Sequence, residues 1–119
     1  MRLFQYIVPL YDNAGKPYGV HPGPESSHFE RWENALIGAF GGFTKGPRQF
    51  GVWTDERGKE YHDESVAYMV AVEPGEIMDA GSNDARLQGL DEAFFAVFTD
   101  QKALFRAEIG TAAIINRPD

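Results

Sequence analysis

Alternating side chains in the first ten residues predict a β-strand. Both faces of this strand are largely apolar, which favours a place in the middle of a sheet over a place at its edge. Pro9 has no backbone N–H and is expected to end the strand. The two faces consist of Phe4, Tyr6 and Val8 on one side and of Leu3, Gln5 and Ile7 on the other.

A helical pattern starts near residue 27. Ser27 and Glu30 have the spacing of a capping box, in which each side chain satisfies a free N–H of the other residue. Gly41 and Gly42 are expected to end the helix, one of them in the left-handed conformation that glycine adopts without strain. The apolar residues at helical spacing are Phe29, Trp32, Leu36 and Phe40, with Ile37 beside them.

Two strands joined by a hairpin are predicted after this helix. A Lys45-Gly46-Pro47 turn leads into a short strand over residues 50–53. Residues 54–59 contain an aspartate and a glycine and are interpreted as the hairpin connection. The next strand, from about Tyr61 to Glu73, alternates valine and tyrosine with alanine and methionine.

A second helix and a last strand complete the pattern. Residues 74–82 are interpreted as a loop, and the helix is expected to begin near Ser82 or Asn83. The last strand is predicted from about Leu104 to Ile115, with Gly110 as a candidate bulge. The apolar stripe of the second helix consists of Leu87, Leu90, Phe94, Val97 and Phe98.

The resulting order, β-α-β-β-α-β, predicts that residues 1–119 form a single α+β domain with a long loop at 11–26. A four-stranded antiparallel sheet with two helices on one face is the ferredoxin-like plait, and an irregular α+β roll is the alternative. The second sheet face would carry residues such as Tyr, Val, Met and Ala instead of charges. We therefore expect self-association through this face, most simply as a twofold homodimer.

Composition narrows the classes of function. The 119-residue chain is 43% hydrophobic and has no cysteine, so it can bury a core while lacking thiolate catalysis, disulfides and cysteine-ligated metals. Its net charge of −7 argues against a nucleic-acid partner, which needs a cationic surface. We recognise neither a signal peptide nor the apolar run of about 20 residues that a bilayer span requires. We therefore expect a soluble cytoplasmic protein with no membrane partner.

Two stretches resemble a family of small bacterial α+β domains of unknown function. The first is Ala39-Phe40-Gly41-Gly42-Phe43-Thr44 followed by Gly51-Val52-Trp53, which is similar to the FGG-x-T and G-x-W pattern of that family. The second is Asp84-Ala85-Arg86 followed by Phe98-x-x-Gln101-x-x-Leu104, which is similar to the family's junction into its last strand. The resemblance covers residues 28–115. It implies a fold of the ferredoxin-like or dimeric α+β barrel type and homo-oligomerisation, and it transfers no catalytic residue.

The three histidines give weak support to a metal site. His21 and His28 lie near Glu30, and His62 stands before two carboxylates, so a His₂-carboxylate set would form if these segments met in space. No tight spacing such as H-x-x-x-H is present, and Glu30 already has a capping role. We therefore interpret these residues as solvated polar groups and predict neither a metal nor another cofactor.

Phosphate binding and nucleophilic catalysis have less support. Gly38, Gly41, Gly42 and Gly46 follow a helix instead of opening one, and they match neither G-x-G-x-x-G nor the P-loop pattern. Ser26, Ser27 and Ser65 do not stand in a G-x-S-x-G elbow. The glycines are therefore interpreted as helix termination and a tight turn.

Aromatic residues are the stronger candidates for a binding site. They either fill the core, which we favour, or line a pocket with a few polar groups such as Gln5, Arg48 and His62. Trp53 is the best single candidate for a binding residue, followed by Phe43, Arg48 and Trp32. The full set consists of Tyr6, Trp32, Phe43, Phe50, Trp53, Tyr61 and Tyr68.

Two functions remain as hypotheses. The favoured one is a dimeric binding or regulatory module for a small molecule or a protein. One form of it is an inhibitor that mimics nucleic acid, for which carboxylates would have to gather on one face. The alternative is a cofactor-independent enzyme similar to the dimeric α+β barrel monooxygenases and isomerases, with a pocket between helices and sheet and His62, His28 or Tyr6 moving protons. The acidic residues of the predicted hairpin, which we interpret as a solvated edge, are Asp55, Glu56, Asp63 and Glu64.

Overall fold

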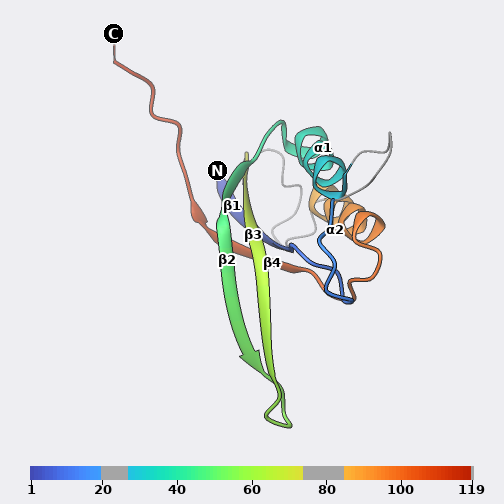
Figure 1. The fold of residues 1–119 in the computed structure, drawn as a ribbon. Helices are drawn as coiled ribbons and strands as arrows, with labels where there is room; N and C mark the ends of the chain where they lie inside the picture. Colours follow the sequence, from blue (N-terminus) through green and yellow to red (C-terminus); the bar gives the residue numbers. More distant parts are fainter. Residues whose placement is uncertain (20–26, 74–84, 119) are drawn as a thin grey trace.

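The computed structural model describes residues 1–19, 27–73 and 85–118 of the chain. Four strands form one sheet in the order β2-β3-β1-β4, and each neighbouring pair is antiparallel. Both helices lie on the same side of this sheet (Figure 1). The α+β class and the central place of the first strand are thus confirmed. The elements are β1 (Arg2–Pro9), α1 (His28–Phe40), β2 (Thr44–Thr54), β3 (Glu60–Val72), α2 (Ala85–Val97) and β4 (Phe105–Thr111).

The core lies between the sheet and the two helices. Tyr6 and Tyr68 are opposite each other in β1 and β3, and both are fully buried. The Trp32 ring of α1 meets them edge-on, with its centroid 5.3 Å from that of Tyr6 and 6.3 Å from that of Tyr68. Phe94 of α2 contacts Trp32 in the same manner at 5.8 Å. These edge-to-face contacts add to the stabilisation that burial of the rings supplies.

The ends of α1 agree with the prediction. Ser27 Oγ accepts a hydrogen bond from the Glu30 N–H at 3.1 Å, and Gly41 has a φ of 81°. Ile37 does not belong to the buried stripe, because it is 50% exposed. Each helical residue is rotated by about 100° from its predecessor, so the residue after the buried Leu36 turns away from the core.

The second helix confirms its predicted stripe, since Leu87, Leu90, Phe94 and Val97 are buried. The predicted loop at 74–82 and the predicted helix start near Ser82 or Asn83 lie outside the described residues. Neither helix of the described part combines the length and the apolar character that crossing a bilayer requires.

The turn predicted at Lys45-Gly46-Pro47 is wrong, because β2 runs unbroken through these residues. The register between β2 and β3 shifts between Lys45 and Arg48, so an irregularity interrupts the pairing without ending the strand. Pro47 has no backbone N–H to donate, which explains why the ladder is interrupted here. A Gly-Pro pair therefore marks a bulge at this position instead of a turn.

The last strand is shorter than predicted. β4 ends at Thr111, and residues 112–118 extend away from the sheet as a tail (Figure 1). The candidate bulge at Gly110 is confirmed, since the register against β1 shifts between Glu108 and Gly110. Directly after Thr111, the Ala112 N–H donates to the Met1 carbonyl at 2.9 Å.

The β2–β3 hairpin extends beyond the helical layer as an arm, which we define as residues 48–64 (Figure 1). Its tip confirms the predicted connection. The Asp55 carboxylate accepts hydrogen bonds from the N–H groups of Arg57 and Lys59, and Gly58 has a φ of 82°. Because the helices do not cover the arm, side chains on both of its faces reach solvent.

Candidate functional site

The sheet face turned away from the helices, which we call the open face, is apolar over its inner part. Ile7 is opposite Ala67 on one side and Phe105 on the other, so these three residues share the open face. Phe105 is 62% exposed there. By the same register, the inner part of the open face contains Leu3, Gln5, Ile7, Ala67, Met69, Ala71, Phe105 and Ala107, and the polar but uncharged residues Ser65 and Thr44 continue it.

Charged residues of β4 and of the start of β2 lie on the helix side of the sheet. Arg106 is opposite Tyr6 and forms an ion pair with Asp91 of α2 at 3.1 Å. Lys45 is opposite Tyr68 and forms an ion pair with Glu33 of α1 at 2.9 Å. Among the described residues, this sorting keeps charged side chains away from the inner part of the open face.

The arm carries an aromatic stack on the side of the open face. Trp53 and Tyr61 lie with ring centroids 4.2 Å apart and an interplanar angle of 10°. Trp53 Nε1 donates to Asp63 Oδ2 at 2.8 Å, and the Tyr61 hydroxyl donates to Asp55 Oδ2 at 3.2 Å. These bonds hold the stack in place. The Trp53 ring remains half-exposed and available to a partner.

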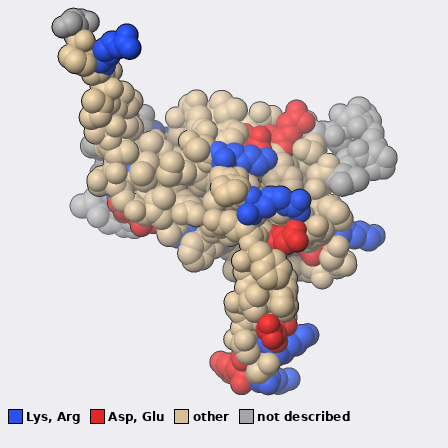
Figure 2. All heavy atoms as spheres, turned by 60° about the vertical axis from the view of Figure 1, so that its left-hand side comes forward, with Lys and Arg blue, Asp and Glu red and all other residues tan. Residues whose placement is uncertain are grey.

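The carboxylates of the arm do not form an uninterrupted acidic face. Arg48 pairs with Glu64 at 2.8 Å, and the turn at the tip contains Arg57 and Lys59 beside its acidic residues. Figure 2 shows side chains of both charge signs gathered at the tip of the arm. The geometry therefore gives no support to mimicry of nucleic acid by the arm.

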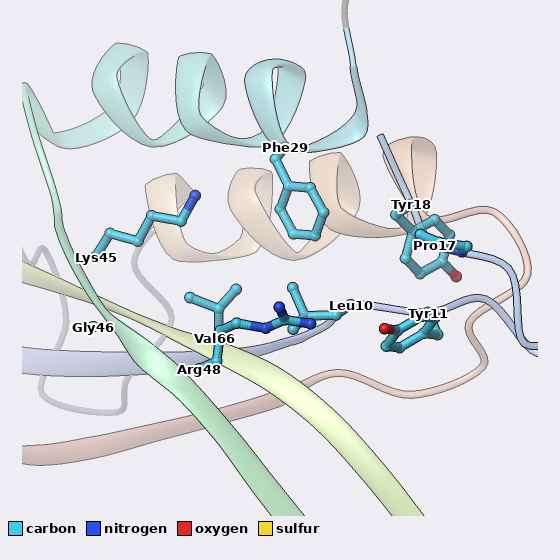
Figure 3. A pocket seen from close by; sticks show the side chains of 9 residues that line it. All are labelled: Leu10, Tyr11, Pro17, Tyr18, Phe29, Lys45, Gly46, Arg48 and Val66. Atoms are coloured by element: carbon cyan, nitrogen blue, oxygen red, sulfur yellow. The ribbon is translucent and has the colours of Figure 1, made fainter. Parts of the chain in front are cut away.

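A cavity of about 350 Å³, which we call the loop pocket, lies between the chain at residues 10–18, α1 and the start of β2 (Figure 3). Its apolar wall consists of Leu10, Pro17, Phe29 and Val66. Tyr11, Tyr18 and Gly46 complete this wall, and the charged lining residues are Lys45 and Arg48. The cavity has the size of sites that hold small organic ligands.

Backbone contacts fold residues 10–18 back onto the sheet and so form one wall of the loop pocket. Leu10 N–H donates to the Glu64 carbonyl at 3.0 Å, and Tyr18 N–H donates to the Leu10 carbonyl at 3.0 Å. Tyr11 and Pro17 form an isolated antiparallel bridge. The predicted loop at 11–26 is thus ordered over its first part, while residues 20–26, which include His21, lie outside the described residues.

A hydrogen-bond network anchors this loop to the end of α2. The Tyr18 hydroxyl donates to Asp100 and accepts from Gln101 Nε2, while the Asn13 N–H donates to Asp100 Oδ2 at 2.7 Å. Burial, followed by the hydrogen bond to Asp100, raises the pKa of Tyr18 to about 12. Tyr18 therefore keeps its proton at neutral pH.

The same network lowers the pKa of Asp100. Partial burial acts to raise it, but the hydrogen bonds from Tyr18 and from the Asn13 N–H outweigh burial. A carboxylate with a lowered pKa stabilises the fold above its unfolded-state pKa, and this contribution is lost as the pH falls through the folded-state pKa. The affected window lies below the ordinary value of 3.8.

Asp100→Asn is accordingly expected to lower the free energy of unfolding by about 1 kcal/mol at pH 7, because charge-assisted hydrogen bonds are weakened. Urea denaturation at pH 7 and at pH 3 measures this effect, and the difference from the unchanged protein should shrink at pH 3. Glu92→Gln, at an exposed position of α2, is the matched control and should have little effect at either pH. A difference that grows upon acidification would contradict this explanation.

The predicted catalytic candidates lie apart from one another. His62 is on the arm, where its ring lies 5.6 Å from that of Phe50 and its Nε2 lies 3.2 Å from Glu60 Oε1. His28 opens α1 and accepts the Gly19 N–H at Nδ1. Tyr6 is fully buried in the core. No group of three or more metal-ligating side chains occurs among residues 1–19, 27–73 and 85–118.

The predicted binding residues are also distributed over the fold. Trp32 is fully buried, and Phe43 packs on the core with its ring 5.5 Å from that of Tyr68. Arg48 lines the loop pocket, and Trp53 is half-exposed on the arm.

Sequence reasoning did not identify Tyr11, Tyr18, Lys45 or Phe105. Phe105 could have been found from the alternation between Phe105 and Ile109, because this pattern predicts an amphipathic strand with one apolar face.

The resemblance to a bacterial domain family stays a prediction. In comparisons with known proteins, the sequence matches no family model and no individual curated protein at a significant level.

Proposed function

We propose that this protein is a homodimeric binding module whose two copies meet through the open face. The observation that carries the proposal is the absence of charge from this face over β1, β4 and the inner part of β3, together with the 62% exposure of Phe105. An apolar sheet face is normally covered by a second layer, and the two helices cover only the opposite face.

A second copy of the chain is the occupant that fits this face. A twofold axis places a patch opposite itself, so the patch has to be complementary to its own image. Apolar and uncharged side chains meet this condition without pairing like charges. Packing of two such sheets brings them to about 10 Å, close enough for side chains such as Phe105 and Met69 to interdigitate.

We also propose that the fold is a ferredoxin-like plait. The supporting observations are the β-α-β-β-α-β order and the sheet order β2-β3-β1-β4, which places β1 and β3 at the centre. Association through the open sheet face is compatible with this architecture, because both helices lie on the other side.

The enzyme hypothesis receives no specific support from the described residues. The polar network around Tyr18 and Asp100 anchors the loop at residues 10–18 to the end of α2. We therefore propose binding and not a reaction. A cytoplasmic location stays a prediction.

The native mass of the purified protein, measured by light scattering across a dilution series, tests the homodimer. We expect twice the mass of one chain, falling toward the mass of one chain only at low concentration. A mass of one chain at all concentrations would contradict the proposal. A larger, non-saturating mass would indicate unspecific association instead of a closed twofold interface.

A further inference from the structure

The loop pocket combines an apolar wall with two cations. In Figure 3, Phe29 lies above the cavity. The Arg48 guanidinium and the Tyr11 hydroxyl both point toward the space beside Leu10. Lys45 lines the same cavity, with its ammonium group 5.5 Å from the Phe29 ring centroid. A site with this lining selects a ligand that has an apolar body and an anionic group.

The bulge in β2 places both cations on the same side of the sheet. Residues three apart in a regular strand point to opposite faces. The register shift makes Lys45 opposite Tyr68 and Arg48 opposite Val66, and both of these partners face the helices. Lys45 and Arg48 are therefore aimed into one cavity, which fits the tendency of bulges to redirect side chains at functional sites.

The lining is cationic although the chain is acidic. The sequence contains 18 acidic and 11 basic residues, but among the residues that the structure describes no carboxylate lines the loop pocket. We infer that the loop pocket binds a small organic carboxylate with an apolar body, held by its carboxylate at Arg48, with Lys45 as the second cation of the lining. The planar Arg48 guanidinium can engage both oxygens of such a group.

A carboxylate fits this site better than a phosphate. Glu33 pairs with Lys45 at 2.9 Å and Glu64 pairs with Arg48 at 2.8 Å, so each cation already has a carboxylate partner outside the lining. A ligand carboxylate with one negative charge can take the place of Glu64 at Arg48, whereas a doubly charged phosphate would leave one negative charge unpaired beside these carboxylates. The Arg48 side chain is 68% exposed in its pair with Glu64, and an exposed ion pair of this kind contributes little, so the ligand carboxylate can compete for the guanidinium.

This inference supplies the ligand of the proposed binding module, but it does not depend on dimerisation. The sheet residues that line the loop pocket, Lys45, Arg48 and Val66, lie on the helix side of the sheet and not on the open face. A monomeric protein that binds the carboxylate would contradict the homodimer and leave this inference intact. A dimer that does not bind the carboxylate would support the homodimer and contradict this inference.

Titration of the ¹⁵N-labelled full chain with benzoate, followed by amide chemical shifts, tests the inference. Benzoate should shift the amides of Tyr11, Tyr18 and Gly46, and benzamide, its neutral counterpart, should bind at least about tenfold more weakly. Inorganic phosphate should not shift these amides. Equal affinity for benzoate and benzamide, or the absence of benzoate shifts at the loop pocket, would overturn the inference.

Two variants assign the site. Arg48→Gln should weaken benzoate binding about tenfold, whereas Arg57→Gln, which removes an equal charge at the tip of the arm, should leave it unchanged. Leu10→Trp should fill the cavity and abolish binding, and well-dispersed amide signals would show that this variant is folded. Equal effects of the two arginine substitutions, or full binding by a folded Leu10→Trp variant, would refute the assignment.

Discussion

Substitution of Phe105 with glutamate is expected to convert the proposed homodimer into monomers. Phe105 is 62% exposed on the open face of the single chain, so the substitution should leave the fold of the monomer intact. In a twofold interface through the open face it would bury two unpaired carboxylates, one from each copy, and each costs several kcal/mol. We expect dimerisation to weaken by at least about 100-fold, measured by light scattering over a dilution series.

Phe95→Glu is the matched control for this experiment. It adds the same negative charge to a partly exposed aromatic position, 40% exposed in the single chain, but on α2 and therefore outside the open face. It should change the dimerisation constant little. If both variants weaken association equally, general electrostatic repulsion explains the effect and the open face is not the interface.

The second large effect concerns the core. Phe94→Ala should lower the free energy of unfolding by about 3–5 kcal/mol, because it removes a fully buried ring and leaves a cavity between two helices and the sheet. The centroid of the Phe94 ring lies 5.8 Å from that of Trp32 and 4.9 Å from that of Phe98, so loss of the ring affects several packed neighbours. Urea denaturation monitored by tryptophan fluorescence measures this change.

Phe95→Ala provides the comparison on the same helix. Its ring is 40% exposed, so we expect a loss of about 1 kcal/mol. Since the two residues are adjacent and chemically identical, helix propensity contributes equally to both results. Similar losses for the two variants would mean that α2 does not pack as the structure describes.

Much of the fold could be predicted from local patterns, and the errors have specific physical reasons. Alternation located β1 and β3, and capping residues located both ends of α1. The Gly46-Pro47 pair was interpreted as a turn because the sequence does not reveal that β3 continues alongside it and holds the strand together. The last strand was extended too far because apolar residues such as Ile114 and Ile115 continue the pattern beyond the sheet.

The candidate sites were less accessible to such reasoning. Among the predicted binding residues, Arg48 lines the loop pocket, whereas Trp32 belongs to the core. Aromatic side chains in a core and in a pocket follow the same spacing, so spacing does not distinguish them. The residues of the loop pocket come from four separate segments of the chain, which meet only because residues 10–18 fold back onto β3.

The sequence by itself determined the elements and the two faces of each strand, because the geometry of the backbone sets the direction of successive side chains. The tertiary structure decided which apolar face the helices cover and which face remains open. It also decided that Lys45 and Arg48 share one cavity, through a bulge that changes their relative direction. These properties depend on register and packing between residues distant in the chain, and the local periodicity of the sequence specifies neither of them.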